Sequence, residues 1–180
     1  MKNSKVKNRR ILNAGQVRVV FERFAREMAR QYGDLGQVVF IGIRTRGPYI
    51  ARRLGEMLKK RHGRVVPVGE MDITLYRDDL NALLPGGSID HTRIPFDIAN
   101  KVVVLFDDVL HTGRTVRAAV DHLIDLGRPR MIHLAVMIDR GGRELPIAAN
   151  YVGKRIILRS AGNVEVRLKE VDKTDEVVIV

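Results

Sequence analysis

The chain has 180 residues, 45% hydrophobic and 29% charged, which is enough for one domain with a sizeable core and too apolar for a disordered protein. Its longest apolar runs fall short of the ~18 residues that a membrane helix needs. No apolar segment follows the basic start MKNSKVKNRR, so we expect neither a membrane span nor a secretory signal. The lack of cysteine excludes disulfides and thiolate metal sites. We expect a single cytoplasmic domain over residues 1–180, with residues 1–12 as a basic N-terminal segment.

Positive charge is concentrated in the first third of the chain. The net charge is +11, and residues 1–64 hold 17 basic and 4 acidic residues, whereas residues 65–180 hold 15 basic and 17 acidic ones. A concentrated basic surface attracts polyanions, of which nucleic acid is the commonest. A solvated face or a basic tail accounts for the surplus equally well, so charge alone leaves both interpretations open.

The first half of the chain begins with a helix. Apolar residues recur at helical spacing after Asn13, a suitable N-cap, and Gly33 ends the segment. The pattern then predicts a strand, a helix, two strands and a long loop, over residues 37–43, 48–61, 64–68, 72–76 and 77–100. Loops of this length are often functional or mobile.

The second half continues the alternation of strands and helices. A strand, a helix and a second buried strand are expected over residues 101–106, 115–126 and 131–138, and further strands over 164–168 and 175–180. This order predicts an α/β fold with a doubly wound, mostly parallel sheet flanked by helices. Ligands bind to such sheets beyond the carboxyl ends of the strands.

The segment VVVLFDDVLHTGRTV, residues 102–116, carries the strongest signal for chemistry. A helix that begins after Gly113 presents backbone N–H groups and a partial positive charge to a phosphate, and the hydroxyls of Thr112 and Thr115 add donors. Asp107 and Asp108 suit sugar hydroxyls or a group bound to Mg²⁺. A phosphate beside a diol indicates a phosphorylated sugar. Capping of the helix alone would not need two acids at the end of a buried strand.

Two further segments add weaker signals. Residues 42–48, GIRTRGP, join a strand to a helix and offer arginines to a second phosphate group, although a plain turn explains them as well. Residues 72–79, DITLYRDD, precede the long loop and are also consistent with an exposed polar hairpin.

These segments together resemble the type I phosphoribosyltransferases, which bind phosphoribosyl pyrophosphate (PRPP). The resemblance implies a small hood above the sheet, a long mobile loop, and Mg²⁺ bound through PRPP with no direct ligand from the protein. It assigns catalysis to Asp107, Asp108 and Arg77, the last of these on the covering loop. The implied PRPP site consists of these two acids with Thr45, Arg46, Val109, Leu110, His111, Thr112, Gly113, Arg114 and Thr115.

The segments DITLYRDDL, LIDLGRPR and AVMIDRGGRELPI narrow the resemblance to the bifunctional pyrimidine operon attenuation regulators and uracil phosphoribosyltransferases. This family makes UMP from uracil and PRPP, and it binds the pyrimidine leader transcript when UMP or UTP is present. The resemblance implies a homodimer or higher oligomer and a uracil site at Arg140 and Val164. Candidate RNA contacts are Arg18, Arg143 and Lys154.

Three positions depart from the family's pattern. His111 stands where Tyr is usual, Gly142 replaces a His, and Ala148 replaces an Arg. Because the last two fall in the region linked to RNA contact, the sequence leaves alternatives: a salvage enzyme without attenuation, or a nucleotide-sensing RNA-binding regulator with little enzymatic role. A transferase for another base, such as a purine, is a third. His133, in a predicted buried strand, is expected to be a satisfied core histidine.

Overall fold

The computed structural model describes residues 9–74, 91–158 and 162–180. Its centre is a five-stranded sheet in the order β3-β2-β4-β5-β6, in which all neighbouring strands are parallel. The strands in chain order are β2 (Val38–Ile43), β3 (Val68–Met71), β4 (Val102–Leu110), β5 (Met131–Asp139) and β6 (Tyr151–Arg155). The predicted α/β class and parallel sheet are confirmed.

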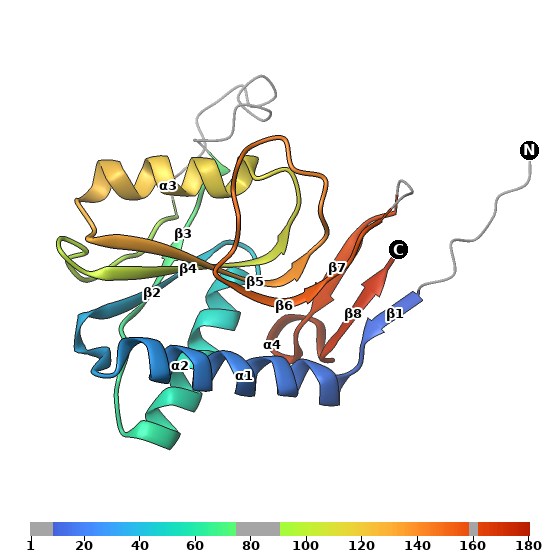
Figure 1. The fold of residues 1–180 in the computed structure, drawn as a ribbon, viewed down its shortest axis with the longest axis horizontal. Coiled ribbons are helices and arrows are strands. Elements are labelled where there is room, and N and C mark those ends of the chain that lie inside the picture. Colours follow the sequence, from blue (N-terminus) through green and yellow to red (C-terminus); the bar gives the residue numbers. More distant parts are fainter. Residues whose placement is uncertain (1–8, 75–90, 159–161) are drawn as a thin grey trace, which may run out of the picture.

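Helices cover both faces of this sheet (Figure 1). One face packs against α1 (Ala14–Tyr32) and α2 (Gly47–His62), and the other packs against α3 (Arg114–Leu126). The strands alternate little between polar and apolar residues because both faces are covered, and every residue of β2 is buried. No helix in the described part of the chain is both long and apolar enough to span a membrane.

A second, antiparallel sheet lies beside the first and has the order β1-β8-β7. It brings together the two ends of the described chain, as β1 (Arg9–Leu12), β7 (Val164–Arg167) and β8 (Glu176–Ile179). The short helix α4 (Lys169–Asp172) lies between β7 and β8 in the chain (Figure 1). This sheet corresponds to the predicted hood, and residues 9–12 of the basic N-terminal segment expected over residues 1–12 form its first strand.

The ends of α1 are fixed by the residues that the sequence indicated. The Asn13 side chain accepts a hydrogen bond from the backbone N–H of Gln16, and the Gln16 side chain accepts one from that of Asn13, which completes a capping box. Gly33 ends the helix at a positive φ. The buried face of α1 includes Phe21 and Phe24, which pack into the larger of two apolar cores.

The structure corrects several predicted elements. Residues 72–76 do not form the predicted strand in the part described, because β3 ends at Met71, and residues 75–90, with most of the predicted loop, lie outside the described residues. Strand β4 continues through Asp107 and Asp108 to Leu110, so the two acids belong to the strand. The sequence analysis missed β1 and β6, which are short and largely half-buried or exposed.

Candidate active site

The carboxyl end of β4 carries the two predicted acids. Asp107 is buried, and its Oδ1 accepts a hydrogen bond from the backbone N–H of Asp108 at 2.9 Å. The Oδ1 of Asp108 in turn accepts one from the N–H of Val109 at 2.8 Å. Burial raises the pKa of Asp108, and the nearby Arg46 guanidinium and these hydrogen bonds offset part of that rise. The two carboxylates are therefore held on fixed backbone donors at the edge of the sheet.

The turn between β4 and α3 leaves the N-terminus of α3 open, as a site for an anion requires. Gly113 precedes the helix at φ +95°, a conformation that disfavours residues with a side chain, and as the N-cap it has no side chain to occupy the helix N-terminus. Thr112 Oγ1 accepts a hydrogen bond from the Arg114 N–H at 3.3 Å. Arg114 itself turns to Glu144, with 2.6 Å between Nε and Oε2. The side chain of Leu110 is buried, so only its backbone can face a ligand.

The turn after β2 brings Arg46 to the same edge. The Arg44–Thr45 peptide bond is cis, Thr45 is exposed, and Arg46 stands at the N-cap of α2. The Arg46 guanidinium contacts the carboxylate of Asp172, with 3.0 Å between Nη2 and Oδ1. Burial alone would raise the pKa of Asp172, but the Leu168 N–H and Arg46 hold it below its ordinary value.

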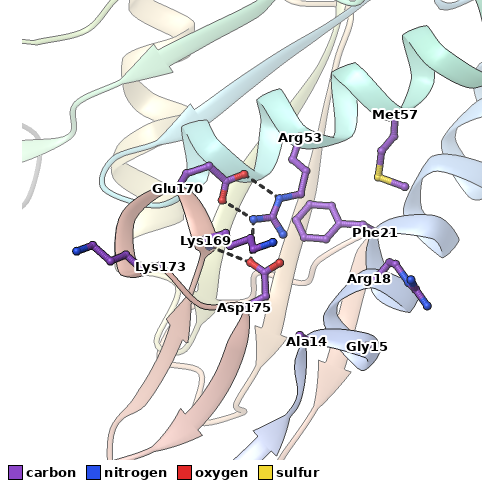
Figure 2. Close-up of a pocket in the computed structure, with 10 residues that line it drawn as sticks. All are labelled: Ala14, Gly15, Arg18, Phe21, Arg53, Met57, Lys169, Glu170, Lys173 and Asp175. Atoms are coloured by element: carbon purple, nitrogen blue, oxygen red, sulfur yellow. Dashed lines mark hydrogen bonds and ion pairs between the residues drawn. The ribbon is translucent and has the colours of Figure 1, made fainter.

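Sequence reasoning missed Asp172 because its partner lies 126 residues away in the chain. Figure 2 shows how α4, the helix that carries this acid, is attached to α2: Arg53 ion-pairs with Glu170 and Asp175. The Arg53 guanidinium also lies 4.8 Å from the ring centre of Phe21. Two arginines of the α2 segment thus hold the C-terminal segment, and the cavity of about 930 Å³ that Figure 2 displays lies beside this attachment, away from Asp107 and Asp108.

The predicted uracil residues are brought close together. Arg140, at the end of β5, donates a hydrogen bond from Nη2 to the backbone oxygen of Gly162 at 3.0 Å, two residues before Val164. Its buried Nε has no hydrogen-bond partner among the described residues. Val164 is half-buried in β7 and packs against the larger core. Within the part of the chain that the structure describes, the Nε of Arg140 is therefore buried and without a partner beside the segment that contains Val164.

Arg143 is fixed within its own loop. Its Nη2 lies 2.6 Å from Oδ1 of Asp139, its Nε donates to the Ile147 oxygen at 2.9 Å, and its Nη1 donates to the His111 oxygen at 2.7 Å. These bonds tie the 139–147 loop to the end of β4. The sequence shows the acid at position 139 but not these carbonyl acceptors, so the structural use of Arg143 was missed.

Two of the departures from the family's pattern lie against each other. Gly142 has φ +70°, and a Cβ built on it would lie 2.9 Å from Nε2 of His111. Burial lowers the pKa of His111, as do the positive charges of Arg140 and Arg143, against the opposing charge of Glu144. The imidazole therefore favours its neutral form beside the Asp107–Asp108 edge.

The three predicted RNA contacts lie on separate elements, and no contact among the described residues joins them. Arg18 lies on α1 and is paired loosely with Glu22 at 3.9 Å, and Figure 2 shows its side chain directed away from Arg53. Lys154, on β6, is exposed, with Nζ 3.4 Å from the Ile11 oxygen. Arg77 lies outside the described residues, so its predicted place on a covering loop stays a prediction.

Comparison with known proteins shows the family to which the chain belongs. The family model described as "Phosphoribosyl transferase domain" matches residues 8–170. The chain belongs to the phosphoribosyltransferase family. It is 50% identical over 169 residues to the bifunctional protein PyrR of Pelotomaculum thermopropionicum, covering 94% of this chain and 93% of that one. It is 47% identical over 171 residues to the bifunctional protein PyrR of Bacillus subtilis, covering 94% of each.

Solved structures support the fold. The hypoxanthine phosphoribosyltransferase of Trypanosoma cruzi matches with a TM-score of 0.72 at 16% identity, covering 95% of each chain. That of Staphylococcus aureus matches with a TM-score of 0.68 at 19% identity, covering 95% of this chain and 90% of the other. The predicted phosphoribosyltransferase fold and the resemblance to the bifunctional regulators are both confirmed.

Proposed function

We propose that the carboxyl edge of the sheet transfers ribosyl phosphate from PRPP to N1 of uracil, and that UMP or UTP controls binding of a pyrimidine leader RNA. The observation that carries the enzymatic half is the Asp107–Asp108 pair directly before the Gly113 turn. The chain is a phosphoribosyltransferase similar throughout its length to bifunctional PyrR proteins, which supports uracil as the base and RNA as the regulatory partner.

In this reaction the bond between uracil N1 and the anomeric carbon forms while the bond from that carbon to pyrophosphate breaks, and the N1 proton leaves to solvent. Asp107 and Asp108 would hold the ribose hydroxyls, so that positioning supplies much of the rate. Backbone N–H groups from Thr112 to Thr115 would bind the ribose phosphate. Arg46 and Arg77 would meet the departing pyrophosphate, and Arg140 the uracil ring.

Mg²⁺ is proposed as the cofactor, held through PRPP. Among the described residues no group of three or more acidic or histidine side chains is placed to hold a metal by itself. A hard cation held through PRPP would take its ligands from substrate oxygens and water, while Asp107 and Asp108 hold the ribose hydroxyls. Bound in this way, the metal would neutralise charge on the pyrophosphate.

The test measures UMP formation from uracil and PRPP, together with filter binding of a pyrimidine leader hairpin, on one preparation. We expect turnover that depends on Mg²⁺, and tighter hairpin binding when UMP is added. An unrelated hairpin of equal length and guanine in place of uracil are the controls. Turnover with guanine but not with uracil would contradict the assigned base. The oligomeric state, a homodimer or larger, would be read from light scattering of the same sample.

One observation favours a second candidate, a salvage enzyme without attenuation. The polar atoms of Arg143 are used within the protein, and Gly142 and Ala148 supply no positive charge beside it. Turnover without UMP-dependent, sequence-selective hairpin binding would establish this alternative in place of the regulator.

A further inference from the structure

A hollow of about 540 Å³ lies at the amino edge of the sheet, opposite the candidate active site, where α1 and α2 both end. Its lining is dominated by cationic side chains, with a small apolar floor: Arg26, Arg30, Arg61, His62, Arg64 and Leu35. The arginines are exposed and Leu35 is buried. The positive surplus that the sequence shows in residues 1–64 is therefore gathered, in part, into one concave surface.

Little negative charge opposes these arginines. Glu22 lies 3.8 Å from Arg61, and Asp34 lies 3.7 Å from Arg64, in pairs whose side chains are exposed on both sides. Such exposed pairs contribute about 0–1 kcal/mol and are screened by salt. Arg26 and Arg30 form no ion pair with another described residue. The hollow keeps most of its positive charge for an external anion.

Stabilisation of the helix ends accounts for only part of this cluster. Cations in the last turn of a helix interact favourably with its dipole, and the basic residues in those positions are Arg30 in α1 and Lys59, Lys60, Arg61 and His62 in α2. Arg64 lies beyond the end of α2, and Arg26 lies more than one turn before the end of α1. Their presence in the same hollow needs another explanation.

The hollow is continued along α1 by a second cationic surface. Arg23 lies one turn before Arg26 and lines a neighbouring hollow of about 490 Å³ with Lys154 and Arg155, beside Glu27. From position 23 to position 30 a helix rises about 10 Å. A small anion would fill one hollow, whereas a chain of phosphates can contact both. Arg23 itself is held by the Val152 and Gly153 oxygens and lies 3.8 Å from Glu27. The exposed cations of this surface are therefore Lys154 and Arg155 at one end and the four arginines of the hollow at the other.

We propose that the hollow formed by Arg26, Arg30, Arg61 and Arg64 binds backbone phosphates of the regulatory RNA, as a second contact region continuous along α1 with Lys154. This inference rests on the proposed regulatory function. Contacts of this kind are made with phosphate and carry no sequence selectivity, so they add affinity and fix the orientation of the strand.

The test compares the Arg30→Gln/Arg64→Gln protein with an Arg128→Gln/Arg130→Gln control. The control removes the same charge from exposed arginines beside another hollow, at the end of α3 on the opposite face of the sheet. The probe is a pyrimidine leader hairpin with UMP, titrated over a range of salt. We expect the first variant to raise Kd about tenfold and to flatten the slope of log K against log salt by roughly 1 to 2. Uracil turnover and the midpoint of thermal unfolding should stay unchanged.

Three outcomes would overturn the inference. An unchanged Kd in Arg30→Gln/Arg64→Gln, with a wild type that binds the hairpin, refutes it and leaves the regulatory function standing. An equal loss in the control shows an effect of net charge only. Inorganic tripolyphosphate is the second probe, and its loss of binding to Arg30→Gln/Arg64→Gln while hairpin binding stays intact would show a small-anion site instead. A wild type that binds neither the leader hairpin nor an unrelated one refutes the regulatory function itself.

Discussion

The two edges of the central sheet hold their arginines in different ways. At the carboxyl edge, Arg46, Arg114 and Arg143 each contact a carboxylate, at 3.0, 2.6 and 2.6 Å. At the amino edge, Arg61 and Arg64 lie 3.8 and 3.7 Å from the nearest acids. Fixed side chains suit a small ligand whose atoms must be placed accurately, because these side chains lose little conformational entropy when the ligand binds. Loosely paired, exposed side chains suit a polymer whose phosphates adopt many arrangements.

Among the substitutions considered at the two edges, Asp108→Asn at the carboxyl edge is expected to have the largest effect on activity. We expect UMP formation to fall by about 100- to 1,000-fold, the size of effect that follows removal of one preorganised polar group. The fold should remain, because the amide can still accept the Val109 N–H. Steady-state kinetics and thermal unfolding measure the two effects, with the exposed Asp125→Asn as the control. Near-normal turnover would refute the assigned role.

The fall in the wild-type transfer rate at low pH, the acid limb of the pH profile, is a second test of the role of Asp108. Because burial raises the pKa of Asp108, the carboxylate takes up its proton at a higher pH than an ordinary aspartate as the pH falls. Loss of transfer should follow that protonation, and Asp108→Asn should lack this limb. A residual rate in Asp108→Asn that retains the same acid limb would assign the limb to another group.

A smaller effect is expected when the carboxylate that fixes Arg46 is neutralised. Asp172→Asn should raise KM for PRPP about tenfold with little change in kcat, because a guanidinium that is no longer oriented must be ordered when the substrate binds. Glu170→Gln is the matched control on the same short helix, since Glu170 pairs with Arg53 and not with Arg46. Equal changes in KM for both variants would show that only the attachment of α4 matters.

The loop beside His111 offers a comparison of two adjacent glycines. Gly141 and Gly142 both have φ near +70°, but only Gly142 has a neighbour, His111, where a Cβ would stand. Gly141→Ala and Gly142→Ala should each lower stability by about 1 kcal/mol, or roughly 2–4 °C in Tm. Only Gly142→Ala should also change KM for PRPP, by about two- to fivefold, because it displaces the imidazole of His111, a residue of the proposed PRPP site. Identical kinetics in both variants would contradict the assignment of His111 to the PRPP site.

The smallest effect is expected at the amino half of the sheet, where His133 lies. Its Nδ1 is 2.5 Å from the hydroxyl of Tyr32, which confirms the expected satisfied histidine. Burial lowers the pKa of His133 below its ordinary value of 6.5, so the unfolded chain binds a proton more readily. The contribution of His133 to the free energy of unfolding should be fully present above pH 6.5. It should decline slightly as the pH falls below 6.5. His133→Gln should show less of this decline in thermal unfolding, whereas the exposed His62→Gln should show all of it.

The sequence predicts those parts of the site whose residues lie close together in the chain, and it does not predict contacts between distant segments. The Asp107–Asp108 pair and the Gly113 turn lie in one continuous stretch, so their spacing alone places them together at a strand end. The Arg46–Asp172 contact joins positions 126 residues apart and has no local pattern. Strand β6 was missed because it lies at the edge of the sheet and contains polar residues that a turn would also contain.

Arg143 shows a further limit of reading side chains from a pattern. The family resemblance implies that Arg143 contacts RNA, which would need an exposed and available guanidinium. The structure surrounds it with carbonyl oxygens of residues 111 and 147 and the carboxylate of Asp139. Backbone acceptors carry no mark in the sequence, so the prediction for Lys154, which is exposed, is better supported than the one for Arg143.

The hood has a consequence for the order in which the protein becomes active during its synthesis. Its middle strand, β8, is the last described strand and pairs with β1, the first described strand, with Arg9 opposite Ile179. A ribosome releases the residues of β8 after the acids of β4 and the Gly113 turn have emerged. Until then β1 has no strand to pair with and the segment that carries Asp172 is not anchored beside Arg46. A nascent chain arrested before β8 would therefore hold a folded sheet with an incomplete substrate site.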